Sequence, residues 1–435
     1  MTMWISGIRG WFRASHWLAM LAVLACAWPW AEALGGIRHK DAAAPEAVKR
    51  PWMEATEPPL MALDVESLGF YPPGAYYEGQ RESLVSLDFL NENRILFTFR
   101  TPGLLHRSAN ADEEERQIRA VVLRLPTGAV DAEAVWTLHD HARYLWMLKD
   151  GHFLLRDLND LKQGDASLTL HPFLHFPGPL LWLEMDPDDQ VLLTNSHEPQ
   201  ASAQPNTGAG GQPAIADSPA DAGPPEIVLR VLQRATGQVT LVSRVHNTVY
   251  LPMNATGYVE TTQQNPRQWQ LTLHDYAGGS APVGTLTTTC DPRVDFITQN
   301  KLLATACNQD GTIRLAAMST TGRKLWDVPT APNQVWPVLF VSPEGSWLAR
   351  ETLFMAHPID AFSPLSFDDV LGQVVEVYDM ATGKVVERVP ASPVLDGGGN
   401  VAISPSGKRL AVLDGGSIKI YDLPGSGAER EVRRH

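Results

Sequence analysis

Residues 374–389 read VVEVYDMATGKVVERV. Two runs rich in β-branched residues, Val374 to Tyr378 and Val385 to Val389, flank a Thr-Gly pair at 382–383. Such runs indicate β-strands, and glycine supplies the positive φ that a tight turn between two strands needs. The stretch therefore predicts an antiparallel β-hairpin.

The same turn recurs along the chain. Further Thr-Gly pairs follow strand-like runs at Thr127-Gly128, Thr236-Gly237 and Thr321-Gly322. A second turn type, rich in proline or acidic residues, precedes apolar runs at 186–189, 342–345 and 404–407. Aligning both turns gives seven units that start near residues 84, 144, 180, 247, 292, 335 and 399. Units of four strands and roughly 50 residues are typical of β-propellers. We therefore predict an all-β fold, a seven-bladed β-propeller of four-stranded antiparallel blades.

Two units give specific expectations. In the sixth, the strands are predicted at Trp336 to Val341, Trp347 to Arg350, Val374 to Tyr378 and Val385 to Val389. The last unit offers only three strands before residue 424. A ring with an open edge risks aggregation, so we expect the N-terminal region from Leu60 to Phe70 to supply the fourth strand.

The first 33 residues predict export. Two arginines precede an apolar run from Trp17 to Ala27, and Ala31 and Ala33 are the small residues that a signal peptidase reads. We predict cleavage after Ala33 and a periplasmic or extracellular location. Two alternatives stay open: the run serves as an uncleaved anchor, or Cys26 is lipidated and tethers the chain to the envelope.

The rest of the chain divides by composition. Residues 34–60 are predicted to be a linker, 61–424 the propeller, 198–225 a disordered insertion of low complexity, and 425–435 a polar tail.

The charge balance argues against nucleic acid as a partner. The 435 residues include 35 Lys and Arg against 49 Asp and Glu, a net charge of -14. Binding to phosphates needs a clustered basic surface, and the one dense basic run lies at the extreme C-terminus.

Two cysteines remain after signal cleavage. In an oxidising compartment Cys290 and Cys307 can form a disulfide. The equally weighted alternative is a pair of buried free thiols, because sequence does not show how close the two lie.

Several dipeptides and one longer stretch carry a family resemblance. These are Trp326-Asp327, Tyr378-Asp379, Tyr421-Asp422 and the stretch AMSTTGRKLW at 317–326. The chain resembles the WD-repeat-like and quinoprotein-like β-propellers over residues 84–424, and the longer stretch looks like the tryptophan-docking repeat of quinoprotein dehydrogenases. The resemblance implies a propeller whose docking tryptophan packs between blades, and it implies no particular activity.

The three longest insertions all join second to third strands of their units, at 101–117, 195–225 and 351–372. In a propeller these connections share one face, and loops on a rigid scaffold are where binding residues concentrate. We therefore expect ligands to bind on that face.

Three predicted second strands end in arginine, at Arg100, Arg156 and Arg350. Together they would form a polar ring at the mouth, suited to an anionic or carbohydrate ligand. The favoured alternative is a structural pairing of each arginine with an acid of a neighbouring turn.

His139 and His141 fall on the same predicted face. Histidines at i and i+2 on an extended chain point to one side and can bind a metal, but no third ligand is identifiable, so ordinary loop contacts are the favoured interpretation. We predict no metal and no cofactor.

The standard catalytic signatures are missing from the sequence, among them Gly-x-Ser-x-Gly, His-Glu-x-x-His and Cys-x-x-Cys. We therefore expect an exported, monomeric propeller that binds a protein, peptide or glycan without chemistry of its own. Membrane contact is expected only if the signal is uncleaved or Cys26 is lipidated. The alternative function is a quinone- or metal-dependent propeller enzyme that uses the central mouth.

Overall fold

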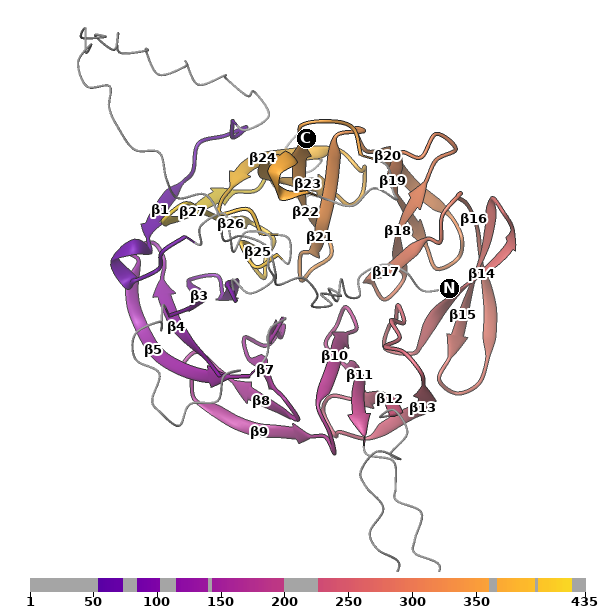
Figure 1. Ribbon diagram of the computed structural model, residues 1–435, viewed down its shortest axis with the longest axis horizontal. Coiled ribbons are helices and arrows are strands. Elements are labelled where there is room, and N and C mark those ends of the chain that lie inside the picture. The colour runs from indigo at the N-terminus through magenta and orange to yellow at the C-terminus, as the bar shows by residue number, and fades with distance from the viewer. Residues whose placement is uncertain are drawn as a thin grey trace, which may run out of the picture. The chain divides into compact units, whose positions relative to one another are not determined.

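A computed structural model describes residues 54–72, 84–101, 115–139, 143–198, 226–359, 366–395 and 398–424. The predicted signal peptide with Cys26, most of the predicted linker, the segment 199–225 and the tail lie outside the described residues. The described residues form seven antiparallel sheets arranged around a central axis, a seven-bladed β-propeller (Figure 1). Among them are two 3-10 helices, η2 (Glu66–Leu68) and η4 (Phe367–Asp369), and no helix that is long and apolar enough to cross a membrane.

The blades follow the chain order, and each sheet begins with its innermost strand. Blade 1 consists of β2 (Ser86–Asn91), β3 (Arg94–Arg100), β4 (Arg116–Arg124) and β5 (Ala129–Leu138). Blade 2 consists of β6 (Leu145–Met147), β7 (Phe153–Asp157), β8 (Asp160–Gly164) and β9 (Leu170–His175). Blade 3 consists of β10 (Leu180–Met185), β11 (Val191–Glu198), β12 (Glu226–Gln233) and β13 (Val239–Val245). Blade 4 consists of β14 (Gly257–Asn265), β15 (Gln268–Asp275) and β16 (Ser280–Thr287), and blade 5 of β17 (Arg293–Thr298), β18 (Lys301–Cys307), β19 (Ile313–Ser319) and β20 (Lys324–Pro329). Blade 6 consists of β21 (Gln334–Val341), β22 (Trp347–Met355), β23 (Val370–Asp379) and β24 (Val385–Ala391). Blade 7 consists of β25 (Val401–Ile403), β26 (Arg409–Asp414), β27 (Ser417–Asp422) and β1 (Met61–Asp64).

The Thr-Gly turns all join the third strand of a blade to the fourth. Their four glycines have positive φ, from 67° to 82°, as the hairpin prediction requires. The turn in blade 6 also packs against blade 5, because a Cβ at Gly383 would lie 2.8 Å from the ring of Trp326. The Trp326 indole donates a hydrogen bond to the Met380 carbonyl at 2.9 Å. The residue predicted to dock between blades therefore does so.

Blade 6 has strands at all four predicted positions, and each of them is longer than predicted. β22 continues five residues beyond Arg350 and β23 begins four residues before Val374. All nine residues of β22 are buried. A strand that is covered on both faces does not alternate between apolar and polar residues, and strand ends are predicted from that alternation. The predicted strand therefore ended before the observed one.

Blade 4 differs from the other six because its sheet has three strands. The chain at the innermost position forms only a short return, in which Met253 bridges to Tyr258 and the Val259 amide donates to the Pro252 carbonyl at 2.8 Å. Pro252 has no amide hydrogen to give to a sheet, and this disfavours a full strand here.

The N-terminal strand closes the ring. β1 pairs antiparallel with β27, from Met61 opposite Ile420 to Asp64 opposite Ser417. Phe70, which follows β1, is buried edge-on against Phe97 of blade 1, with ring centroids 5.2 Å apart. The predicted closure by residues near Leu60 to Phe70 is confirmed.

Candidate functional site

The three predicted insertions all start and end on the same face of the ring. β3 ends at residue 100 and β4 begins at 116; the corresponding gaps are 199–225 in blade 3 and 356–369 in blade 6, and all three are second-to-third connections. Adjacent strands are antiparallel and every sheet has the same order from the axis outward, so these connections share a face with the links between blades. We call this the insertion face. Most residues of the three insertions lie outside the described part of the chain.

Arg350 is a buried structural group. Its side chain is 3% exposed and forms an ion pair with Glu376, which stands directly opposite on β23. Arg388 binds the second carboxylate oxygen of Glu376 at 2.6 Å, and Tyr378 and Thr352 also donate to this carboxylate. Burial opposes ionisation of Glu376, but the two guanidinium groups outweigh it and lower the pKa. The sequence placed Arg350 at the end of a strand, whereas it lies in the middle of β22.

The other two predicted arginines lie in different surroundings. Arg156 on β7 is buried between blades 2 and 3, where it donates to the Leu181 carbonyl at 3.3 Å and lies over the ring of Trp146 at 5.8 Å. Arg100 is half-buried at the end of β3. The structure therefore buries Arg156 and Arg350 and leaves Arg100 half-buried, and ligand binding by these arginines stays a prediction.

The structure describes one of the two predicted histidines. His139 lies at the link from blade 1 to blade 2, and its Nδ1 is 3.0 Å from the Asp157 carboxylate at the end of β7. Its backbone amide donates to the same oxygen at 3.2 Å. His141 lies outside the described residues. Within the described ranges no three His, Cys, Asp or Glu side chains are placed to hold a metal ion.

The innermost strands carry charged groups that the sequence analysis did not single out. Burial raises the pKa of Glu184 on β10 to about 7, with Arg143 and Arg293 opposing the shift and Asp295 adding to it. Burial likewise raises the pKa of Asp88 on β2 to about 6, against a hydrogen bond from Ser86 and the charge of Arg143. Asp295 therefore influences Glu184 although blade 4 lies between their two blades.

Glu351, also missed by the sequence analysis, is a carboxyl group that has no cation beside it among the described residues. It is 1% exposed on β22 between blades 6 and 7, and one of its oxygens accepts a hydrogen bond from the Gln373 amide at 3.4 Å. The other oxygen has no hydrogen-bond partner among the described residues. Burial raises the pKa of Glu351 to about 8.

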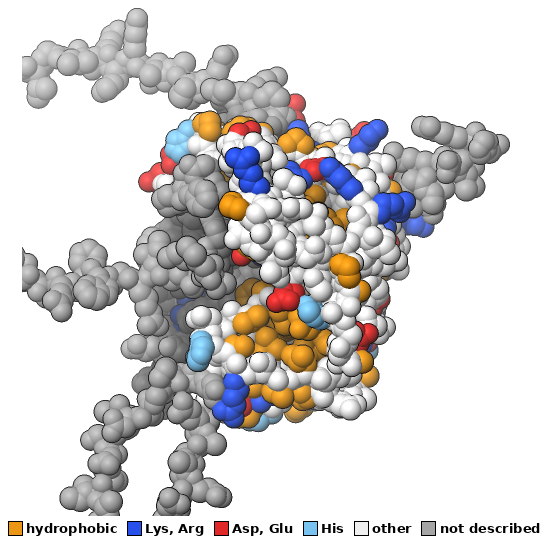
Figure 2. Space-filling model, turned by 90° about the vertical axis from the view of Figure 1, so that its right-hand side faces the viewer, with side chains coloured by type: hydrophobic (Ala, Val, Ile, Leu, Met, Phe, Trp, Pro, Cys, Tyr) orange, Lys and Arg blue, Asp and Glu red, His pale blue; other side chains and the backbone are white. Residues whose placement is uncertain are grey.

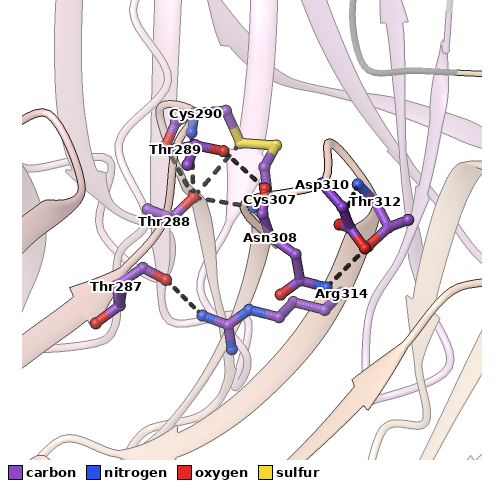
Figure 3. The surroundings of a disulfide bond; sticks show 9 residues. All are labelled: Thr287, Thr288, Thr289, Cys290, Cys307, Asn308, Asp310, Thr312 and Arg314. Carbon is purple, nitrogen blue, oxygen red and sulfur yellow. Dashed lines mark hydrogen bonds between the residues drawn. A yellow bond between two sulfur atoms is a disulfide. The ribbon is translucent and has the colours of Figure 1, made fainter.

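The predicted cysteine pair lies on the insertion face. Cys290, in the link from blade 4 to blade 5, is bonded to Cys307 at the end of β18, with their Cα atoms 5.5 Å apart (Figure 3). The buried Thr288 hydroxyl accepts the Cys307 amide at 2.9 Å and donates to the Cys290 carbonyl at 3.0 Å. The link and the strand end are therefore fixed to each other by one covalent bond and several hydrogen bonds.

A cavity of about 350 Å³ lies beside this disulfide. Its walls carry hydroxyl, amide, guanidinium and carboxylate groups, contributed by Arg267, Thr287, Thr288, Thr289, Asn308, Gln309, Arg314 and Asp327. Arg314 is held in place, since it pairs with Asp327 and donates to the Thr287 carbonyl at 2.6 Å, as Figure 3 shows for the second contact. Arg267 is exposed at the tip of the β14–β15 hairpin. The arrangement can hold a polar ligand by several hydrogen bonds at once.

Comparison with known proteins gives structural similarities and no family. No protein-family model matches the chain, and no curated protein matches it. The solved structures similar to it include the Pyrococcus horikoshii acylaminoacyl peptidase, at 10% identity and a TM-score of 0.45 over 80% of this chain and 53% of the peptidase. The chain thus spans about half the length of that peptidase.

Two further structures are similar over most of their length. The β-propeller domain of the Trilobed protease from Pyrococcus furiosus is 9% identical, with a TM-score of 0.43 over 79% of this chain and 96% of that domain. A chain of the mitotic checkpoint complex is 14% identical, with a TM-score of 0.42 over 88% of this chain and 97% of the other. The strand order and the closure by β1 themselves identify the protein as a seven-bladed β-propeller.

Proposed function

We propose that this protein is exported and acts as a non-catalytic propeller that binds a protein, peptide or glycan on its insertion face. The cavity beside the Cys290–Cys307 bond carries this proposal. Its volume of about 350 Å³ falls within the range of small-ligand sites, and it lies among loops that a rigid scaffold positions.

The lining favours a ligand with many hydrogen-bonding groups. Thr287, Thr289 and Gln309 are exposed there and offer both donors and acceptors. Arg267 adds a guanidinium that can bind a carboxylate or hydroxyl pair in a forked geometry. A sugar chain or the polar surface of a peptide presents such groups, and the disulfide reduces the motion that binding would otherwise have to suppress.

Binding is tested with the full secreted chain, fluorescently labelled, on arrays of glycans and peptides. The double variant Arg267→Glu with Gln309→Ala changes two exposed groups of the cavity wall. Arg323→Glu is the matched control, because Arg323 is exposed on the same blade in the third-to-fourth turn, on the opposite face. We expect the cavity variant to bind the strongest array ligand with an affinity at least about tenfold lower, which is the scale of one lost charged hydrogen bond. The control should keep the affinity of the wild type to within about twofold. Equal affinities of the two variants would remove the cavity from the proposal.

Export is tested independently by N-terminal sequencing of the protein recovered from its producing cells. A mature chain that begins at Leu34 supports cleavage after Ala33. A retained Met1 contradicts it, and a lipidated N-terminal Cys26 would replace the soluble form by a tethered one.

A further inference from the structure

The outermost strand of blade 3 differs from the other outermost strands. Each of the other six contains a proline or an acidic residue, the groups that proteins use to keep a free sheet edge from pairing: Asp64 in β1, Asp131 and Glu133 in β5, Pro172 in β9, Pro282 in β16, Asp327 and Pro329 in β20, Glu387 and Pro390 in β24. β13 reads VTLVSRV and contains neither. Its one charged residue is Arg244.

β13 also presents apolar side chains on both faces of its sheet. It pairs with β12, and no other described strand pairs with it, so its outer row of backbone groups faces no strand of the described chain. Val242 and Val239 are 63% and 44% exposed. Leu241 and Val245 are half-buried, and they face blade 4 together with Val231.

The seam between blades 3 and 4 is the least closed of the seven. Its apolar cluster has five buried and seven partly buried residues, whereas the cluster between blades 7 and 1 has 18 buried and two partly buried. Figure 2 looks onto the side of the ring where blade 4 lies and shows apolar side chains gathered at the surface there. An added strand on β13 would extend this cluster outward through Leu241 and Val245.

We propose that the free edge of β13 binds an extended segment of a partner protein, which adds a fifth strand to blade 3. Main-chain hydrogen bonds would provide the affinity and the alternating side chains the specificity. Because β13 is apolar on both faces, the segment carries apolar, β-branched residues on both faces too.

The proposal concerns another seam than the cavity beside the disulfide, so it can fail without affecting the proposed function. The probe is a labelled seven-residue peptide, Val-Ile-Val-Thr-Val-Ile-Val, titrated with the full chain and followed by fluorescence anisotropy. The control probe is the same peptide with proline at its centre, which cannot complete the pairing. We expect saturable binding of the first peptide and at least about tenfold weaker binding of the second.

Two lysine variants localise the binding. Val242→Lys places a charge on the free edge, and Val135→Lys does the same on β5, where the valine is 56% exposed. Since both sites are exposed, both variants should fold, and unchanged melting temperatures verify this. We expect Val242→Lys to lower the affinity for the peptide by about tenfold or more and Val135→Lys to lower it by less than about twofold. In the wild type, binding of the peptide should slow amide hydrogen exchange at 239–245.

Three results would overturn the proposal. They are equal binding of the two peptides, equal effects of the two lysine variants, and self-association of the chain that Val242→Lys abolishes. The last would make a second copy of the protein the occupant of this edge.

Discussion

Replacing Glu351 by glutamine should make the protein more stable at neutral pH. The carboxyl group is buried between blades 6 and 7, where the described residues give it one long hydrogen bond and no neighbouring cation. Burial raises its pKa from 4.5 to about 8, so the folded protein keeps this group protonated at a pH at which the unfolded chain releases the proton.

The sign and size of the effect follow from that difference. The folded state binds the extra proton, so stability is complete below pH 4.5 and is lost as pH rises through the interval up to about 8. Each pH unit inside the interval costs about 1.4 kcal/mol, so the wild type should lose about 3 kcal/mol through this group between pH 5 and pH 7.5. Glutamine has a similar shape and no proton to release.

The assay is urea unfolding of wild type and Glu351→Gln at both pH values, followed by tryptophan fluorescence and by far-ultraviolet circular dichroism. The stability of the variant relative to the wild type should increase by about 3 kcal/mol from pH 5 to pH 7.5. Parallel pH profiles of the two proteins would refute the reasoning, because they would mean that Glu351 ionises inside the fold without cost.

The remaining predictions concern the bonds that hold the ring together. Replacing Cys290 and Cys307 by serine should lower the free energy of unfolding by about 3 kcal/mol, because the disulfide closes a loop of 17 residues. Calorimetry at fixed pH measures this loss. An unchanged melting temperature, together with an unchanged mass on reduction and alkylation of the wild type, would show that the bond is absent. Leu63→Ala removes a buried side chain of β1 and should lower the free energy of unfolding by about 2 to 4 kcal/mol in the same assay. A chain that starts at residue 71 lacks β1 and should lose the circular dichroism of the fold. A stable truncated chain would contradict closure by β1. Glu376→Gln leaves Arg350 buried without its carboxylate and should cost about 3 kcal/mol or more; because the pKa of Glu376 is lowered, this contribution is present at neutral pH and is lost in acid, so wild type and variant should converge as pH falls.

Local turn chemistry explains why the blade count could be predicted from sequence. The Thr-Gly turns need a residue with positive φ wherever a third strand meets a fourth, and the four glycines provide it in four different blades. Closure could also be predicted, because a last unit of three strands requires a fourth strand from elsewhere in the chain. The first inference depends on a turn that four blades share, and the second on a strand that the last unit lacks.

The candidate sites depend on features that the repeats do not share. Glu351 and Glu376 look in the sequence like residues of a solvent-facing strand, yet β22 and β23 are covered on both sides, so the two carboxyl groups are buried. Arg350 looked like a strand-end residue for the same reason. The cavity beside the disulfide joins residues 267, 287–289, 308–309, 314 and 327 from two blades, a combination that no local pattern in a single sequence reveals.

Ligand binding on the insertion face is tested most directly by photo-crosslinking in the cells that produce the protein. A photoreactive amino acid is placed at Gln309 on the cavity wall or at Arg323 on the opposite face, and both variants are checked for unchanged melting. The proposed function predicts a discrete adduct from position 309 that is absent at 323 and is lost when Arg267→Glu is added. The same adducts from both positions, or an adduct only from position 323, would contradict it.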